Sequence, residues 1–339
     1  MDIPQKGTLA YGAWNALNNG LRVKHDERVL IITDAVTASV GDAFFEQAFN
    51  LTNRPPHFFQ LEIFGRPLQE YPREIKEILP SVAVSVYAAS AGEGELATFR
   101  KNFLRDVVKH DVRHGHGISI TEQIMLDSVQ TDYTLIAERC EALYQRLHGT
   151  PWARITAPGG TDVVTEFLPS VIWAKDNGIW LPNQWHNIPS GEIFTAPHNT
   201  KGIIVIDGVL GDHFDTRYGL IHDKPLVWRV YNNHVIDVAC NDAELETAFR
   251  SYIAGPTNRS MIGELGIGVL DTQGLIGLLL QDEKMRGTLH FAVGDNLADH
   301  TKAPDNKADN HCDGVIIKPT LTLANGDVIL KDGVYQSNA

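Results

Sequence analysis

A histidine and an aspartate separated by one residue, His311 and Asp313, are the clearest sign of chemistry in the sequence. On an extended backbone, residues i and i+2 point to the same side, so these two side chains can share one ion. Imidazole and carboxylate groups are the usual protein ligands of zinc, manganese, cobalt and iron(II). Cys312 would point to the opposite side, where packing is its expected role. A second strand-like segment, GTLHFAVGDN, carries His290. We therefore expect a metal site on extended segments.

Two glutamates upstream stand among glycines and apolar residues: Glu192 in NIPSGEIFTAP and Glu264 in GELGIG. Such surroundings indicate buried strands or tight turns, where a lone carboxylate is costly. A cation that neutralises both glutamates explains them most simply. Structural roles stay open on the spacing alone, because Glu192 can cap a turn by accepting backbone N–H bonds and His290 can be a hydrogen-bonded core histidine.

Other charged residues have two interpretations each. Glu283 and Lys284 are either a solvated turn pair or a catalytic acid and an anchor for a substrate carboxylate. His114 and His116 form an HxH pair, but they lie in the other half of the chain. We therefore assign the catalytic roles to Glu264, Glu283 and Lys284, and no metal to the HxH pair.

Strand and helix patterns alternate over residues 1–150. Buried-strand patterns cover 28–34, 57–64 and 81–89, and helical spacing covers 38–51 and 122–148. This alternation predicts an α/β domain with a Rossmann-like or flavodoxin-like parallel sheet. The chain after the first strand reads DAVTASVGD rather than GxGxxG, so dinucleotide binding is not supported.

Short strands separated by turn residues dominate residues 151–339. The segments YNNHVID and LANGDVIL contain residue pairs typical of hairpin turns. One helix is expected at 241–253, capped by Asn241 or Asp242. We predict a β-rich α+β domain here, which carries the metal site and catalysis.

Composition excludes several classes of protein. The 339 residues carry a net charge of −13, and no long run of basic residues could bind nucleic acid. No segment has the apolar length of a membrane span and the N-terminus lacks the pattern of a signal peptide, so the expected location is the cytoplasm. The three cysteines form no CxxC pair, which argues against a disulfide framework and a thiolate zinc site.

Five motifs in order resemble the thermophilic metallo-aminopeptidase family of the aminopeptidase T type. They are GTD at 160–162, NIPSGEIFTAP, GELGIG, DEKMRGTLHFAVGDN and HCDGVI, and RHGHGISITEQIM resembles the family's first half. The resemblance implies an α/β domain followed by a β-rich metal-binding domain. It also implies a homodimer, a small-molecule or short-peptide substrate, and an aminopeptidase reaction in which metal-activated water attacks a peptide or amide bond.

Carried over by motif, the metal ligands are Glu192, Glu264, His290, His311 and Asp313. The implied cofactor is a pair of divalent ions, zinc, cobalt or manganese. Two ions roughly 3.5 to 4 Å apart need a carboxylate that bridges them, and Glu264 is the candidate bridge.

One departure from the family and a second resemblance keep alternatives open. Leu297 stands where the family's peptidases have a tyrosine. The motif frame also resembles the 2,5-dihydroxypyridine ring-opening dioxygenases, which hold a single Fe(II) with two histidines and an aspartate. Those relatives carry histidine at the position of Glu264, so this glutamate favours the dinuclear hydrolase. A binding protein with a structural metal is the third hypothesis.

Overall fold

The computed structural model describes residues 2–92, 94–211, 214–255 and 257–337. Contacts divide the chain into two compact units, the first formed by Met1–Ala137 and Asp176–Ser190, the second by Glu138–Lys175 and Gly191–Ala339. The chain passes between the two units after residues 137, 175 and 190. The reason is one short strand that returns to the first unit and pairs with its sheet.

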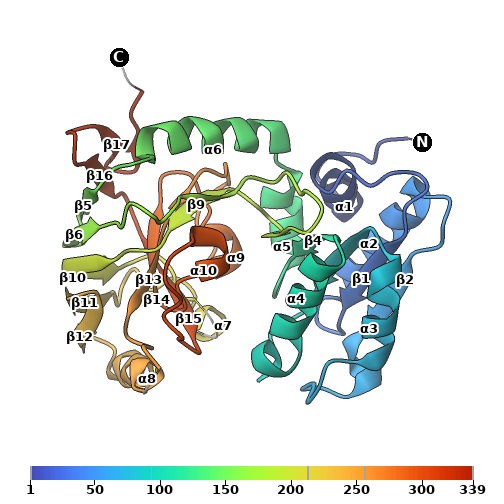
Figure 1. The fold of residues 1–339 in the computed structure, drawn as a ribbon, viewed down its shortest axis with the longest axis horizontal. Coiled ribbons are helices and arrows are strands. Elements are labelled where there is room, and N and C mark those ends of the chain that lie inside the picture. Colours follow the sequence, from blue (N-terminus) through green and yellow to red (C-terminus); the bar gives the residue numbers. More distant parts are fainter. Residues whose placement is uncertain (1, 93, 212–213, 256, 338–339) are drawn as a thin grey trace. The chain divides into compact units, whose positions relative to one another are not determined.

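The first unit contains a five-stranded sheet in which all neighbouring strands are parallel (Figure 1). The order is β2-β1-β3-β4-β8, the 2-1-3-4-5 pattern of flavodoxin-like sheets. The strands are β1 (Val29–Thr33), β2 (His57–Gln60), β3 (Val84–Ala88), β4 (Arg113–His116) and β8 (Trp185–Asn187). All residues of β1 and β3 are buried, which explains why their sequences are mostly apolar, with Thr33 and Ser85 as the polar exceptions.

Helices precede and follow the strands of this unit. They are α1 (Leu9–Asn15), α2 (Ala38–Leu51), α3 (Arg73–Ile78), α4 (Lys101–Lys109) and α5 (Glu122–Leu126), with shorter π and 3-10 turns at Ala16–Gly20, Leu61–Phe64, Leu79–Ser81, Leu96–Arg100 and Ser128–Gln130. The helix predicted at 38–51 is confirmed. The strand predicted over 57–64 ends at Gln60, because the chain then forms a 3-10 turn that closes at Gly65 with φ 75°. A buried core that includes Ile32, Phe99 and Phe103 fills this unit.

The second unit contains two antiparallel sheets. The eight-stranded sheet has the order β12-β11-β10-β6-β5-β16-β17-β18, and the five-stranded sheet has the order β15-β14-β13-β9-β7. The strands are β5 (Trp152–Thr156), β6 (Asp162–Glu166), β7 (Ala174–Asp176), β9 (Glu192–Thr195), β10 (Asn199–Ile206), β11 (Leu226–Tyr231), β12 (His234–Ala239), β13 (Ile262–Gly268), β14 (Leu289–Gly294), β15 (His311–Ile316), β16 (Thr320–Leu323), β17 (Val328–Lys331) and β18 (Val334–Tyr335). The predicted β-rich character of this part is confirmed.

Turn and cap chemistry behaves as expected in this unit. Asn232 and Asn233 both have positive φ, 48° and 63°, and join β11 to β12. Asp242 caps α8 (Ala243–Ile253) by accepting bonds from the backbone N–H groups of Glu244 and Leu245. The other helices are α6 (Tyr133–Leu147), α7 (Phe214–Tyr218), α9 (Leu279–Asp282) and α10 (Ala298–Thr301). Within the described residues, none of the helices has the length and apolarity that a bilayer crossing requires.

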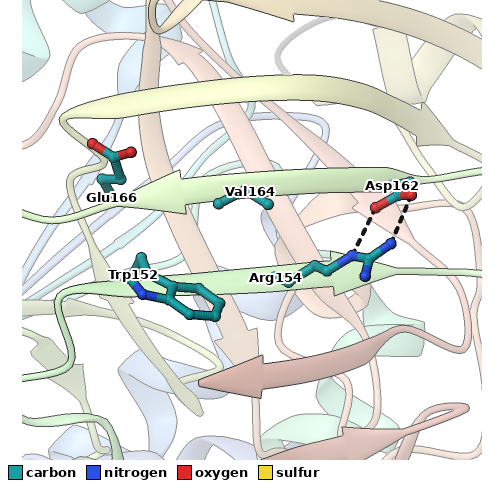
Figure 2. A pocket seen from close by; sticks show the side chains of 5 residues that line it. All are labelled: Trp152, Arg154, Asp162, Val164 and Glu166. Carbon is teal, nitrogen blue, oxygen red and sulfur yellow. Dashed lines mark hydrogen bonds and ion pairs between the residues drawn. The ribbon is translucent and has the colours of Figure 1, made fainter. Parts of the chain in front are cut away.

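Strands β5 and β6 show how the eight-stranded sheet presents one polar side (Figure 2). Arg154 donates two hydrogen bonds, 3.0 and 2.9 Å long, to the Asp162 carboxylate on the neighbouring strand. Trp152 is 38% exposed, whereas Ala153 and Ile155 are buried. This alternation is the expected pattern for a sheet with one face on the core.

Candidate metal centre

The five predicted ligands lie on one face of the five-stranded antiparallel sheet of the second unit. Gly268 of β13 pairs with Glu192 of β9, Gly266 pairs with His290 of β14, and Glu264 pairs with Ala292. Ala292 pairs in turn with Asp313 of β15, and Gly294 pairs with His311. Directly paired residues of antiparallel strands share a face, and so do residues i and i+2. The register therefore brings Glu192, Glu264, His290, His311 and Asp313 to the same side.

The ligand atoms of these residues form two triads that share one member. The first triad is Glu192, Glu264 and His290, and the second is Glu264, His311 and Asp313. Within each triad the ligand atoms lie within 4.8 Å of one another, and either triad can hold a metal ion. Glu264 faces both triads, because Oε1 lies 3.4 Å from Nε2 of His290 and Oε2 lies 3.3 Å from Nε2 of His311.

Backbone carbonyls fix the orientation of both histidines. Nδ1 of His290 donates to the carbonyl oxygen of Glu283 at 3.1 Å, and Nδ1 of His311 donates to that of Asp295 at 2.9 Å. Each ring therefore turns Nε2 toward the carboxylates, which is how metal-ligating histidines are commonly held. The role of the Asp295 carbonyl was not predicted, although Asp295 lies in the GDN segment at the end of β14.

Electrostatics in the site favour positive charge at the two Nε2 positions. Burial alone would lower the pKa of His290, but the carboxylates of Glu264, Glu192 and Asp313 raise it to about 10. The pKa of His311 is raised for the same reason. Burial opposes ionisation of Asp313, yet the two histidines lower its pKa to about 2. Oxygen and nitrogen donors that attract a cation in this way fit a divalent metal.

Glu283 and Lys284 lie beside the first triad. The Lys284 side chain has no exposed surface, and its Nζ contacts the Glu283 carboxylate and lies 3.1 Å from Oε1 of Glu192. Burial raises the pKa of Glu283 to about 8, although the charge of Lys284 opposes this shift. The pair is therefore not a solvated turn.

Two glycines of β13 make room for the site. A Cβ at Gly266 would lie 2.9 Å from Cδ2 of His290 and closer still to Nε2. A Cβ at Gly268 would lie 2.5 Å from the carbonyl carbon of Lys284. The spacing of the glycines in GELGIG thus matches the two residues that must come close to this strand.

Leu297 and the HxH pair have different surroundings. Leu297 precedes α10 in a left-handed conformation, φ 48°, and its N–H donates to the Asp295 carboxylate at 2.9 Å. His114 and His116 lie buried in β4 of the first unit and bond to each other at 3.1 Å, with Ser85 2.8 Å from His114. Neither belongs to the metal-ligand groups found among the described residues.

Two of the solved structures that are similar to this chain match it over nearly its full length. The chain is similar to 2,5-dihydroxypyridine dioxygenase from Pseudomonas putida KT2440, with a TM-score of 0.73, 15% identity and 99% of each chain covered. It is also similar to wild-type AmpT from Thermus thermophilus, with a TM-score of 0.69, 14% identity, and 97% of this chain and 99% of that chain covered. No protein-family model and no curated protein matches the sequence. The neighbours are of the two kinds that the motifs resemble, so the resemblance is confirmed at the level of the fold.

Proposed function

We propose that the protein is a dinuclear metal-dependent hydrolase, an aminopeptidase that cleaves a peptide or amide bond of a small substrate. One observation supports this proposal above the others: the two oxygens of Glu264 face the Nε2 atoms of two different histidines, at 3.4 and 3.3 Å. A carboxylate with one oxygen toward each of two ligand groups is what a bridge between two ions requires.

The buried charges of the site support bound divalent cations. The site gathers four buried carboxyl groups, those of Glu192, Glu264, Glu283 and Asp313, and the buried ammonium of Lys284. Because burial raises the pKa of Glu283 to about 8, this carboxyl group is protonated near pH 7, and two negative charges remain when the histidines are neutral. A buried excess of negative charge is costly, and a bound divalent cation offsets it. The proposal of two ions rests on the position of Glu264, whose two oxygens face different histidines.

The residues would divide the work as follows. Glu192 and His290 would hold one zinc, cobalt or manganese ion, His311 and Asp313 would hold the other, and Glu264 would contribute to both. When bound, such a pair lowers the pKa of water and stabilises developing negative charge. Glu283 takes up or releases a proton beside the site, and Lys284 keeps Glu192 in place. We do not propose Lys284 as an anchor for a substrate carboxylate, because its ammonium already contacts two carboxylates inside the protein.

A mononuclear iron(II) dioxygenase that opens a hydroxylated ring is the second candidate. Two observations favour it. The Nε2 atoms of His290 and His311 lie 4.0 and 3.4 Å from Oδ1 of Asp313. Two histidines and one carboxylate are the ligand set of such enzymes. Leu297 supplies no hydroxyl where the peptidases that the motifs resemble have tyrosine.

A paired activity assay separates the candidates. Protein loaded with zinc, cobalt or manganese is tested for release of ammonia from aminoacyl amides, and protein loaded with Fe(II) is tested for oxygen uptake with 2,5-dihydroxypyridine. Amide hydrolysis that is lost in Glu264→Ala and kept in Glu166→Ala supports the hydrolase. Glu166 is a suitable control because it lies on β6, at the polar side of the eight-stranded sheet (Figure 2). Oxygen uptake without hydrolysis contradicts the proposal.

Partners and location follow the same resemblance. We propose a homodimer that acts in the cytoplasm on a small molecule or short peptide, without nucleic acid or membrane. The net charge of −13 supports the exclusion of nucleic acid. Light scattering of the purified protein tests the dimer.

A further inference from the structure

Lys284 is a fixed positive charge inside the second unit. Its side chain has no exposed surface, and its Nζ lies 3.1 Å from Oε1 of Glu192. The segment after α9 delivers it, and Gly268 at the end of β13 permits the close approach of the Lys284 backbone. A methionine or leucine would fill the same space without charge, so the ammonium is a specific feature of this site.

The Lys284 ammonium directly contacts a ligand of the first triad. Glu192 is a member of the first triad only, and the ammonium already occupies one of its oxygens. The other oxygen, Oε2, lies 3.4 Å from Nε2 of His290. A cation that enters the first triad must therefore share Glu192 with Lys284. Lys284 also acts electrostatically on Asp313 of the second triad, whereas its direct 3.1 Å contact is with Glu192 of the first triad.

Solvent exposure also differs between the histidines of the two triads. The His290 side chain is 1% exposed, whereas the His311 side chain is 26% exposed. Of the two histidines, His311 is therefore the one with exposed surface that an incoming ion can reach. Repulsion between like charges falls with distance, so the ion bound beside Glu192 experiences more of the Lys284 charge.

We infer that the two metal positions are unequal, with Glu264, His311 and Asp313 binding the first ion tightly and Glu192 and His290 binding a weaker, exchangeable second ion against Lys284. This inference rests on the proposed dinuclear function and deepens it. Its consequence is that metal supply controls the activity, because the protein at limiting metal holds one ion and becomes complete only when the second is bound.

Titration of metal-free protein with Co²⁺, followed by calorimetry and by the visible cobalt spectrum, tests the inference. The wild type is expected to bind in two steps whose affinities differ about tenfold or more. Lys284→Met is expected to tighten the weaker step by about tenfold and to leave the tighter step within about threefold. Lys224→Met is the matched control, because Lys224 also pairs with a carboxylate at 3.1 Å, that of Asp242. It should leave both steps unchanged.

A second comparison does not depend on the folding of the Lys284 variant. With half an equivalent of Co²⁺, the spectrum of the wild type should match that of His290→Ala, in which the second triad is intact, and not that of His311→Ala. A match to His311→Ala would overturn the inference. Two equal steps in the wild type, or a weaker step unchanged in Lys284→Met, would also overturn it while leaving the dinuclear proposal standing. Saturation at a single ion per chain would contradict the dinuclear proposal itself.

Discussion

Replacement of Gly266 by alanine should remove one metal ion without unfolding the protein. Gly266 pairs with His290 across β13 and β14, and a Cβ there would lie 2.9 Å from Cδ2 of the histidine ring and closer still to Nε2. Ordinary contacts begin near 3.4 Å, so the ring must retreat by about 1 Å. Metal ligands tolerate deviations of only about 0.2 Å, which means that this shift is enough to abolish ligation by His290.

The expected stability cost of Gly266→Ala is about 1–3 kcal/mol, typical of overpacking in a core. Metal content should fall by one ion per chain, measured by elemental analysis after gel filtration, and the urea midpoint should fall modestly. Gly117→Ala is the control, because its Cβ would come no closer than 3.2 Å to Ile120 in the first unit. Full metal content in Gly266→Ala would refute the assignment of His290 as a ligand.

Two further predictions concern buried side chains that can carry a charge, Lys284 and His114. Lys284→Met should destabilise metal-free protein by about 3–5 kcal/mol, since Glu192 and Glu283 lose a buried partner. Urea unfolding in chelator, with and without added zinc, checks this loss, and equal stability of variant and wild type in chelator would contradict it. Burial lowers the pKa of His114 from 6.5 to about 3, although its bond to Ser85 opposes the shift. Between these values the unfolded chain binds the proton, so stability should fall as pH drops below about 6.5, by about 1.4 kcal/mol per pH unit for this group. His114→Gln should show a correspondingly shallower loss in urea unfolding from pH 7 to 4.5, and parallel curves would be inconsistent with this explanation.

Much of the site follows from local sequence rules. The i and i+2 spacing of His311 and Asp313 fixes their common face as soon as the segment is a strand, and burial of Glu192 and Glu264 follows from the apolar residues around them. His290 was predicted as a ligand from the order of the motifs that resemble the aminopeptidase family. The helix at 38–51, the Asp242 cap and the Asn232–Asn233 turn also follow from local patterns.

What the sequence could not provide depends on pairing between distant segments. Gly266 lies opposite His290 only because of the pairing register between β13 and β14. The sequence of β13 alone therefore does not show that this glycine leaves space for the histidine ring. The burial of Lys284 depends in the same way on the end of β13. The return of β8 to the first unit was also missed, because a three-residue strand has too few positions for a pattern.

Metal stoichiometry tests the shared role of Glu264 most directly. The protein is purified without added metal and without a metal-binding tag, and its metal content is compared with those of Glu264→Ala, His290→Ala and His311→Ala after identical reloading. The dinuclear centre predicts two zinc, cobalt or manganese ions per chain in the wild type, one in each histidine variant, and less than one in Glu264→Ala. A single iron in the wild type that persists in Glu264→Ala would contradict it.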